Sequence, residues 1–174
     1  GRLIRSPTVT FRAAEIGERR FGLNMPNAHL LKVLSGAVGA HPRISWRATT
    51  VEHWKLGPGE AVATLADGAE ISAKLVVAAD GRASPARHAA GITSRRRDLP
   101  QAALVFNVTH ERTHGATSTE FHTPYGPFTQ VPLPGLRSSI VWVERPDAAE
   151  ALASLPVDEV ARRAEERMDS MLGV

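Results

Sequence analysis

The fold class of this chain is decided by the stretch from Leu75 to Arg87, which reads LVVAADGRASPAR. Its first five residues are apolar and typical of a β-strand, and Asp80-Gly81 marks a turn. Ser84 followed by Pro85 is typical of the N-cap and first position of a helix. A strand, a turn and a helix in this order resemble the crossover unit of a dinucleotide-binding α/β domain, where ligands lie beyond the carboxyl ends of the strands.

Two interpretations of Asp80-Gly81 follow from the residues themselves. Gly81 would let the backbone come close to a bound pyrophosphate, and free N–H groups at the helix start would favour an anion. Asp80 would repel phosphate, so its expected partners are sugar or ribityl hydroxyls, backbone N–H groups or water. Alternatively, Asp80-Gly81 only makes a tight turn and Arg87 a surface ion pair. The residues alone leave both interpretations open.

The residues before Leu75 predict a helix and a small antiparallel meander. A strand is expected at Thr8–Ala13. Asn27 is expected to be the N-cap of a helix whose apolar residues follow i, i+4 spacing and which ends before Pro42. Turn signals at Gly57-Pro58-Gly59 and Asp67-Gly68 then separate short strands. The three strands of this meander are expected at Ile44–Val51, Ala61–Leu65 and Glu70–Ser72.

Polar and apolar residues alternate in the second half of the chain, which predicts a mainly antiparallel sheet because the connections are too short for parallel crossovers. Asp147 with Glu150 is an acidic variant of a capping box, and the apolar face of a last helix starts at Val157. The fold class is therefore α/β (α+β), with the sheet and helix in residues 98–174. The strands are expected at Leu104–His110, Thr117–Thr123, Phe128–Leu133 and Ser138–Glu144.

Composition excludes several classes of protein. Hydrophobic residues make up 43% and charged residues 22%, without a long apolar run, which indicates a globular segment that is neither disordered nor transmembrane. No cysteine is available for a disulfide, a nucleophile or a thiolate metal site. Arg95-Arg96-Arg97 is interpreted as a solvated loop, and aromatic residues do not interleave with the arginines as nucleic-acid binding requires.

The histidines and serines do not predict a reactive site. His110 and His114 are four residues apart, a spacing that brings ligands together on a helix, but they lie at an expected strand end and turn. The N-cap position already accounts for Ser84, so we do not expect a nucleophile there. We therefore predict no metal site and name no catalytic residue.

The pattern Asp-Gly-x-x-Ser-x-x-Arg, formed by Asp80, Gly81, Ser84 and Arg87, resembles the second flavin fingerprint of the para-hydroxybenzoate hydroxylase class of FAD-dependent aromatic hydroxylases. Asn27-Ala28-His29-Leu30 is similar to a helix start that faces the flavin in this class. Residues 121–128, 132–134 and 138–142 resemble the substrate-domain sheet of its ubiquinone-biosynthesis branch, in the same order. Gln130 stands where those relatives usually have an aliphatic residue.

This resemblance implies an internal fragment of a monooxygenase, with part of the FAD-binding domain in residues 1–97 and the substrate domain in residues 98–174. The first and third flavin fingerprints of the class would lie before Gly1 and after Val174. The implied reaction uses FAD, NAD(P)H and O2 to hydroxylate an aromatic ring, and the implied substrate is a polyprenyl phenol of ubiquinone biosynthesis. The implied cofactor-binding residues are Asn27, Asp80, Gly81 and Arg87, and the implied substrate side comprises Gly126, Pro127, Phe128 and Val131.

The same resemblance sets expectations for the fragment by itself. We expect it to be inactive and to bind FAD weakly or not at all, because the other fingerprints are missing. We expect a cytoplasmic protein without a nucleic-acid partner, and leave open peripheral association of the whole protein with the inner membrane and a homo-oligomer. We also expect exposed apolar surface and self-association. The alternatives are a flavoenzyme of the same fold with another substrate, and a non-catalytic binding module.

Overall fold

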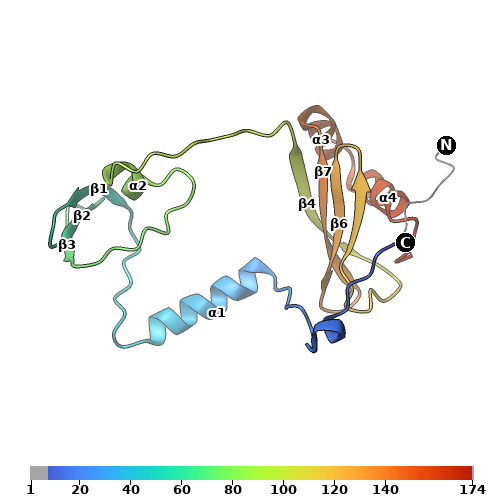
Figure 1. The fold of residues 1–174 in the computed structure, drawn as a ribbon, viewed down its shortest axis with the longest axis horizontal. Coiled ribbons are helices and arrows are strands. Elements are labelled where there is room, and N and C mark those ends of the chain that lie inside the picture. Colours follow the sequence, from blue (N-terminus) through green and yellow to red (C-terminus); the bar gives the residue numbers. More distant parts are fainter. Residues whose placement is uncertain (1–7, 174) are drawn as a thin grey trace. The chain divides into compact units, whose positions relative to one another are not determined.

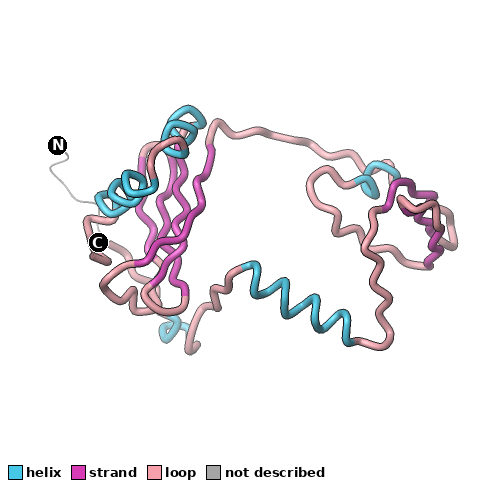
Figure 2. Tube along the Cα trace, turned by 180° about the vertical axis from the view of Figure 1, so that it is seen from behind, coloured by secondary structure: helices cyan, strands magenta, loops and turns pink. Residues whose placement is uncertain are grey.

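The computed structural model describes residues 8–173, which fall into two compact units. One unit contains Leu34–Leu99, and the other contains the described residues on either side of it. Figure 1 labels the elements of both units, and Figure 2 separates helices, strands and loops by colour. Each unit is described by itself below.

The unit Leu34–Leu99 contains a three-stranded antiparallel sheet in the order β1-β2-β3. Its strands are β1 (Val51–Leu56), β2 (Ala61–Leu65) and β3 (Glu70–Ala73). The predicted meander is thus confirmed, but its first strand was placed too early. β1 begins where the predicted strand Ile44–Val51 ends, because the register pairs Val51 with Leu65 and Trp54 with Ala63 of β2.

The predicted strand Leu75–Ala79 is wrong, because these residues belong to no ladder in the described part of the chain. Leu75 and Val77 are 80% and 82% exposed. Backbone N–H and C=O groups in a strand need a neighbouring strand, which side-chain composition cannot supply. The predicted strand Thr8–Ala13 is wrong for the same reason: these residues pair with no strand, and the 3₁₀ helix η1 (Ala13–Ile16) follows.

Helices α1 and α2 lie between residues 27 and 89. Helix α1 (Asn27–Ala40) confirms the predicted helix, but the carbonyl of Pro26 accepts the first hydrogen bonds, from the N–H groups of His29 and Leu30. The N-cap prediction for Asn27 is therefore one residue late. No residue of α1 is buried, and its apolar side chains Leu30, Leu31, Val33 and Leu34 are exposed. Helix α2 (Pro85–Ala89) begins after Ser84 as predicted, and the Ser84 hydroxyl accepts the N–H of Arg87 at 3.0 Å.

The other unit contains an antiparallel sheet in the order β4-β7-β6-β5, which confirms the four predicted strands to within a few residues. These strands are β4 (Ala102–Thr109), β5 (Thr119–Thr123), β6 (Gly126–Leu133) and β7 (Arg137–Glu144). Strands β5, β6 and β7 follow each other as a meander, whereas β4 pairs with β7 from Ala102–Glu144 to Thr109–Arg137.

Helices α3 (Pro146–Ala153) and α4 (Val157–Arg167) cover one face of this sheet (Figure 1). The core between them is formed by Phe128, Ile140, Trp142, Leu152, Ala164, Met168 and Leu172. The predicted capping box is wrong: α3 begins at Pro146, so Asp147 lies in its first turn, and its N-cap Arg145 makes no side-chain cap bond. Val157, expected on the apolar face of the last helix, is 82% exposed.

A buried polar chain crosses this core from β4 to β6. His110 Nδ1 lies 2.8 Å from the carbonyl of Arg112, so Nδ1 carries the proton and Nε2 accepts from the Ser138 hydroxyl at 2.9 Å. Ser138 Oγ in turn accepts from Gln130 Nε2 at 2.8 Å. Gln130 is fully buried and its Oε1 has no hydrogen-bond partner. A buried acceptor without a donor destabilises this unit.

Candidate cofactor site

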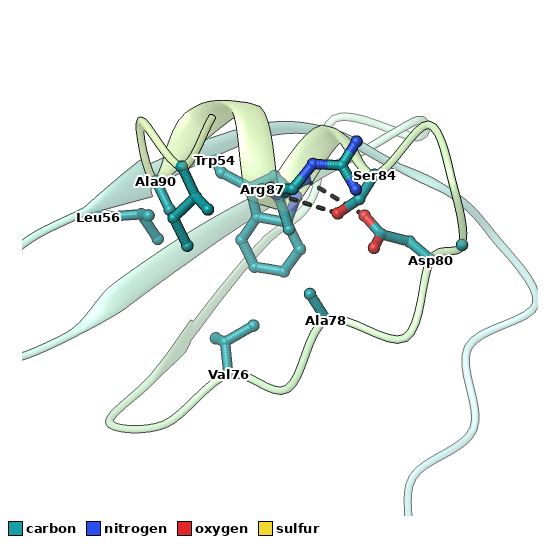
Figure 3. Close-up of a pocket in the computed structure, with 11 residues that line it drawn as sticks. Trp54, Leu56, Val76, Ala78, Asp80, Ser84, Arg87 and Ala90 are labelled. Carbon is teal, nitrogen blue, oxygen red and sulfur yellow. Dashed lines mark hydrogen bonds between the residues drawn. The ribbon is translucent and has the colours of Figure 1, made fainter. Parts of the chain in front are cut away.

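A cavity of about 380 Å³ lies in the unit Leu34–Leu99, between β1, residues 76–81 and α2 (Figure 3). Trp54 of β1 lies between α2 and the segment that carries Val76 and Ala78. Leu56 and Ile92 extend the apolar wall. The polar groups at the cavity are contributed by Asp80, Ser84 and Arg87. An apolar cavity with few polar groups is the usual form of a ligand site.

Asp80 is held by the start of α2. Its Oδ2 accepts the N–H of Ala86 at 3.2 Å. A hydrogen bond with the Ser84 side chain, followed by the Ala86 N–H and the charge of Arg87, lowers the pKa of Asp80 below its usual value. Asp80 therefore remains ionised at neutral pH.

The first turn of α2 does not offer the free N–H groups that the sequence predicted. Asp80 takes the N–H of Ala86, and Ser84 takes that of Arg87. Helix N-termini attract anions through such unpaired donors, and here the chain supplies its own acceptors. The expectation of free N–H groups at this helix start is therefore wrong for Ala86 and Arg87, and binding of an anion there stays a prediction.

Gly81 and Arg87 leave groups at the cavity that a ligand could reach. Gly81 has a φ of +85°, which favours glycine, and no heavy atom lies within 4 Å of the position that a Cβ would take. Arg87 donates from Nη2 to the carbonyl of Arg82 at 2.8 Å. Its Nε is buried without a partner. A ligand acceptor at this N–H would remove the cost of leaving a buried donor unpaired.

The structure brings three of the four predicted cofactor residues together, namely Asp80, Gly81 and Arg87. Asn27 is the first residue of α1 and is exposed, and it is assigned to the other unit. Trp54 was not among the predicted residues. The sequence could have indicated it, because Trp54 and Leu56 are two residues apart and lie on the same face of β1. The predicted strand ended at Val51, so neither residue was included in it.

The predicted substrate residues lie on both faces of β6. Phe128 is fully buried in the core and packs its ring on Trp142, with ring centroids 5.3 Å apart. Pro127 and Val131 are half-buried and, by the alternation of a strand, lie on the opposite face. Gly126 is the first residue of β6 and lies close to the side chain of Val143. Phe128 therefore packs in the core, whereas Pro127 and Val131 are only half-buried.

Within residues 8–173, no group of three or more His, Cys, Asp or Glu residues could hold a metal ion. No helix in this range is long and apolar enough to cross a membrane.

Comparison with known proteins gives consistent results. The family described as FAD binding domain matches residues 20–171. Ubiquinone hydroxylase UbiL of Rhodospirillum rubrum is 45% identical over 111 residues, which cover 64% of this chain and 26% of that protein. The 3-demethoxyubiquinol 3-hydroxylase of Escherichia coli is 29% identical over 175 residues, with coverage of 95% and 42%.

The crystal structure of PqsL from Pseudomonas aeruginosa, described as a probable FAD-dependent monooxygenase, is similar in fold. Its TM-score is 0.65 at 21% identity, over 82% of this chain and 41% of that one. The chain thus spans less than half the length of each of these relatives.

Proposed function

The chain belongs to the FAD binding domain family, and on this premise we propose that the whole protein is an FAD-dependent monooxygenase that hydroxylates an aromatic ring. The family match over residues 20–171 carries this proposal. We propose NAD(P)H as the reductant, O2 as the second substrate, and a polyprenyl phenol of ubiquinone biosynthesis as the ring substrate. The names of two relatives, ubiquinone hydroxylase and 3-demethoxyubiquinol 3-hydroxylase, support this choice of ring. The cytoplasmic location, peripheral membrane association and homo-oligomer stay predictions.

The residues at the cavity fit a flavin dinucleotide. We propose that Asp80 accepts hydrogen bonds from ligand hydroxyls through the lone pairs that Ala86 leaves free. Gly81 would allow close approach of the ligand, and the unpaired Nε–H of Arg87 would donate to an acidic or carbonyl oxygen. FAD, when bound, supplies the redox chemistry that activates oxygen.

The contribution of the chain itself is to bind and orient the cofactor and the substrate and to exclude water from the cavity. Asp80 remains charged because Ser84 and Ala86 lower its pKa, so it cannot serve as a proton donor near neutral pH. Trp54 and Val76 present an apolar wall that keeps water from one side of the cavity. We further propose that Asn27 contacts the cofactor, and that Gly126, Pro127 and Val131 lie along the substrate.

A pair of glycines in the same unit tests the cofactor assignment. Gly81 and Gly68 each follow an aspartate in a turn, with φ values of +85° and +81°, and each has open space at its Cβ position. Valine at either position therefore costs a similar backbone strain of about 1–3 kcal/mol. In the whole protein, Gly81→Val is expected to weaken FAD binding by about tenfold or more, the equivalent of about 1.4 kcal/mol, relative to Gly68→Val.

The measurement is the FAD content after purification and the Kd from flavin fluorescence, with thermal unfolding to verify that both variants are equally folded. Equal FAD affinity of the two variants would show that Gly81 does not approach the flavin. Turnover of a prenylated phenol, followed by NAD(P)H oxidation and product mass, tests the substrate separately. If FAD binds but only an unprenylated substrate is hydroxylated, the ring substrate proposed here is wrong and the flavin assignment stands.

A further inference from the structure

The positive charge of the chain is concentrated in one part of the unit Leu34–Leu99. Residues 74–99 contain six basic residues and two acidic ones, a net charge of +4, whereas the whole chain has a net charge of +3. The remaining residues therefore carry a net charge of −1. The basic residues are Lys74, Arg82, Arg87, Arg95, Arg96 and Arg97, and the acidic residues are Asp80 and Asp98.

The three consecutive arginines lie in an exposed connection without helix or strand. Arg96 donates from Nε to Asp98 at 2.8 Å, and both side chains are largely exposed. No carboxylate among residues 8–173 lies within 4.0 Å of Arg95 or Arg97. Arg95 and Arg97 are both exposed. The segment therefore presents two guanidinium groups without a carboxylate within this distance.

Apolar residues stand at both ends of this run. Leu99, which follows the run, is 61% exposed. Ile92, which precedes it, also borders the cavity of the candidate site but is still 60% exposed. Guanidinium groups bind phosphate through paired N–H donors, and apolar side chains beside them gain by entering the boundary between headgroups and acyl chains. We propose that residues 92–99 contact an anionic phospholipid surface.

Single-stranded nucleic acid is the other polyanion that such a run of arginines could bind. Its binding sites combine the positive charge with aromatic side chains on which bases stack. No aromatic residue occurs between Ile92 and Leu99. The aliphatic flanks therefore favour a lipid surface over nucleic acid.

The test is co-sedimentation of the full 174-residue chain with two kinds of vesicle. One kind contains phosphatidylcholine alone, and the other contains equal parts of phosphatidylcholine and phosphatidylglycerol. We expect binding only to the anionic vesicles, weakening as salt is added. The Arg95→Ala/Arg97→Ala variant is expected to bind about thirtyfold more weakly, because each basic side chain near an anionic surface contributes roughly a fivefold factor.

Arg19 and Arg20 supply the matched control. They form another run of basic residues between exposed apolar residues, Ile16 and Phe21, but Glu15 and Glu18 bring the net charge of residues 15–20 to zero. The Arg19→Ala/Arg20→Ala variant removes the same charge and is expected to keep most of the vesicle binding. Far-UV circular dichroism would verify that both variants fold like the parent.

Three results would overturn the inference. The first is equal binding to neutral and anionic vesicles. The second is an equal loss of vesicle binding in the two double variants. The third is binding to oligothymidine that is tighter than binding to vesicles and that disappears in the Arg95→Ala/Arg97→Ala variant. The last result would assign the segment to nucleic acid. This inference rests on the peripheral membrane association predicted above and names the residues for it. None of these measurements requires flavin or turnover, so their outcome is independent of the proposed reaction.

Discussion

Gly126→Ala is expected to destabilise the four-stranded sheet through one identifiable contact. Gly126 follows the turn between β5 and β6, where its carbonyl accepts the Thr123 hydroxyl at 2.7 Å. A Cβ at Gly126 would lie 2.5 Å from Cγ1 and 2.8 Å from Cβ of Val143 on strand β7. The φ of Gly126 is +153°, a conformation that L side chains rarely adopt.

The expected loss of unfolding free energy in Gly126→Ala has two parts. Overpacking against Val143 costs about 1–3 kcal/mol, and the backbone conformation costs about 1–3 kcal/mol, so the free energy of unfolding should fall by about 2–6 kcal/mol. Val143→Ala removes the closer of the two contacts. The loss of unfolding free energy in the double variant should therefore be about 1 kcal/mol smaller than the sum of the losses in the two single variants.

The assay is urea unfolding of the parent, both single variants and the double variant. Trp142 in the core of this unit is 2% exposed and reports its unfolding. Replacing Trp46 and Trp54 by phenylalanine in every protein leaves Trp142 as the only tryptophan. Equal m-values would verify that the denatured state is unchanged. Additivity of the two single losses to within about 0.5 kcal/mol would refute the reasoning, because it would show that Gly126 and Val143 do not interact.

Two further predictions concern polar groups in the same unit. Gln130→Leu is expected to leave the free energy of unfolding in urea within about 1 kcal/mol of the parent, or to raise it. The variant loses a hydrogen bond to Ser138, which costs about 0.5–1.5 kcal/mol. It also removes a buried oxygen without a partner, which gains about 1–3 kcal/mol. A much larger loss would mean that Gln130 Oε1 has a partner. Hydrogen bonds from Arg162 and Arg163 lower the pKa of Glu159 from 4.5 to about 2, so its contribution to stability is full above pH 4.5 and is lost as the pH falls towards 2. Thermal unfolding in this pH window should be less pH-dependent for Glu159→Gln than for the parent, and identical profiles would contradict the ion pairs.

Sequence alternation predicted the four-stranded sheet well because helices bury one of its faces. Successive residues of β7 alternate between buried and less buried positions, which is the pattern that a half-covered sheet requires. The same periodicity in β6 puts Phe128 with Gln130 on the core face and Val131 on the other. The burial of Phe128 could therefore have been predicted from the sequence, although the family resemblance grouped it with the substrate residues.

The wrongly predicted strands depended on backbone pairing, which residue composition does not show. The run Leu75–Ala79 has the composition of a strand, but no described strand pairs with it. In the candidate site, the sequence predicted Asp80, Gly81 and Arg87 together. The expectation that Asp80 accepts from backbone N–H groups is confirmed at Ala86, but the sequence could not name this partner, because the contact depends on how residues 81–85 fold. It also could not show that Trp54 faces the same cavity.

The pairing of β4 with β7 has a consequence for the order of folding. Strands β5, β6 and β7 can form a local meander, whereas β4 gains its partner only when Arg137–Glu144 is in place. Bringing β4 to β7 closes a long loop, and the entropy of the chain falls before the new hydrogen bonds form. The meander should therefore form early, and β4 should dock last. On the ribosome, β4 emerges before its partner β7, so its unpaired backbone N–H and C=O groups can pair with another strand in the meantime. The earliest strand of this sheet is thus the part of the unit most dependent on protection while the chain is being made.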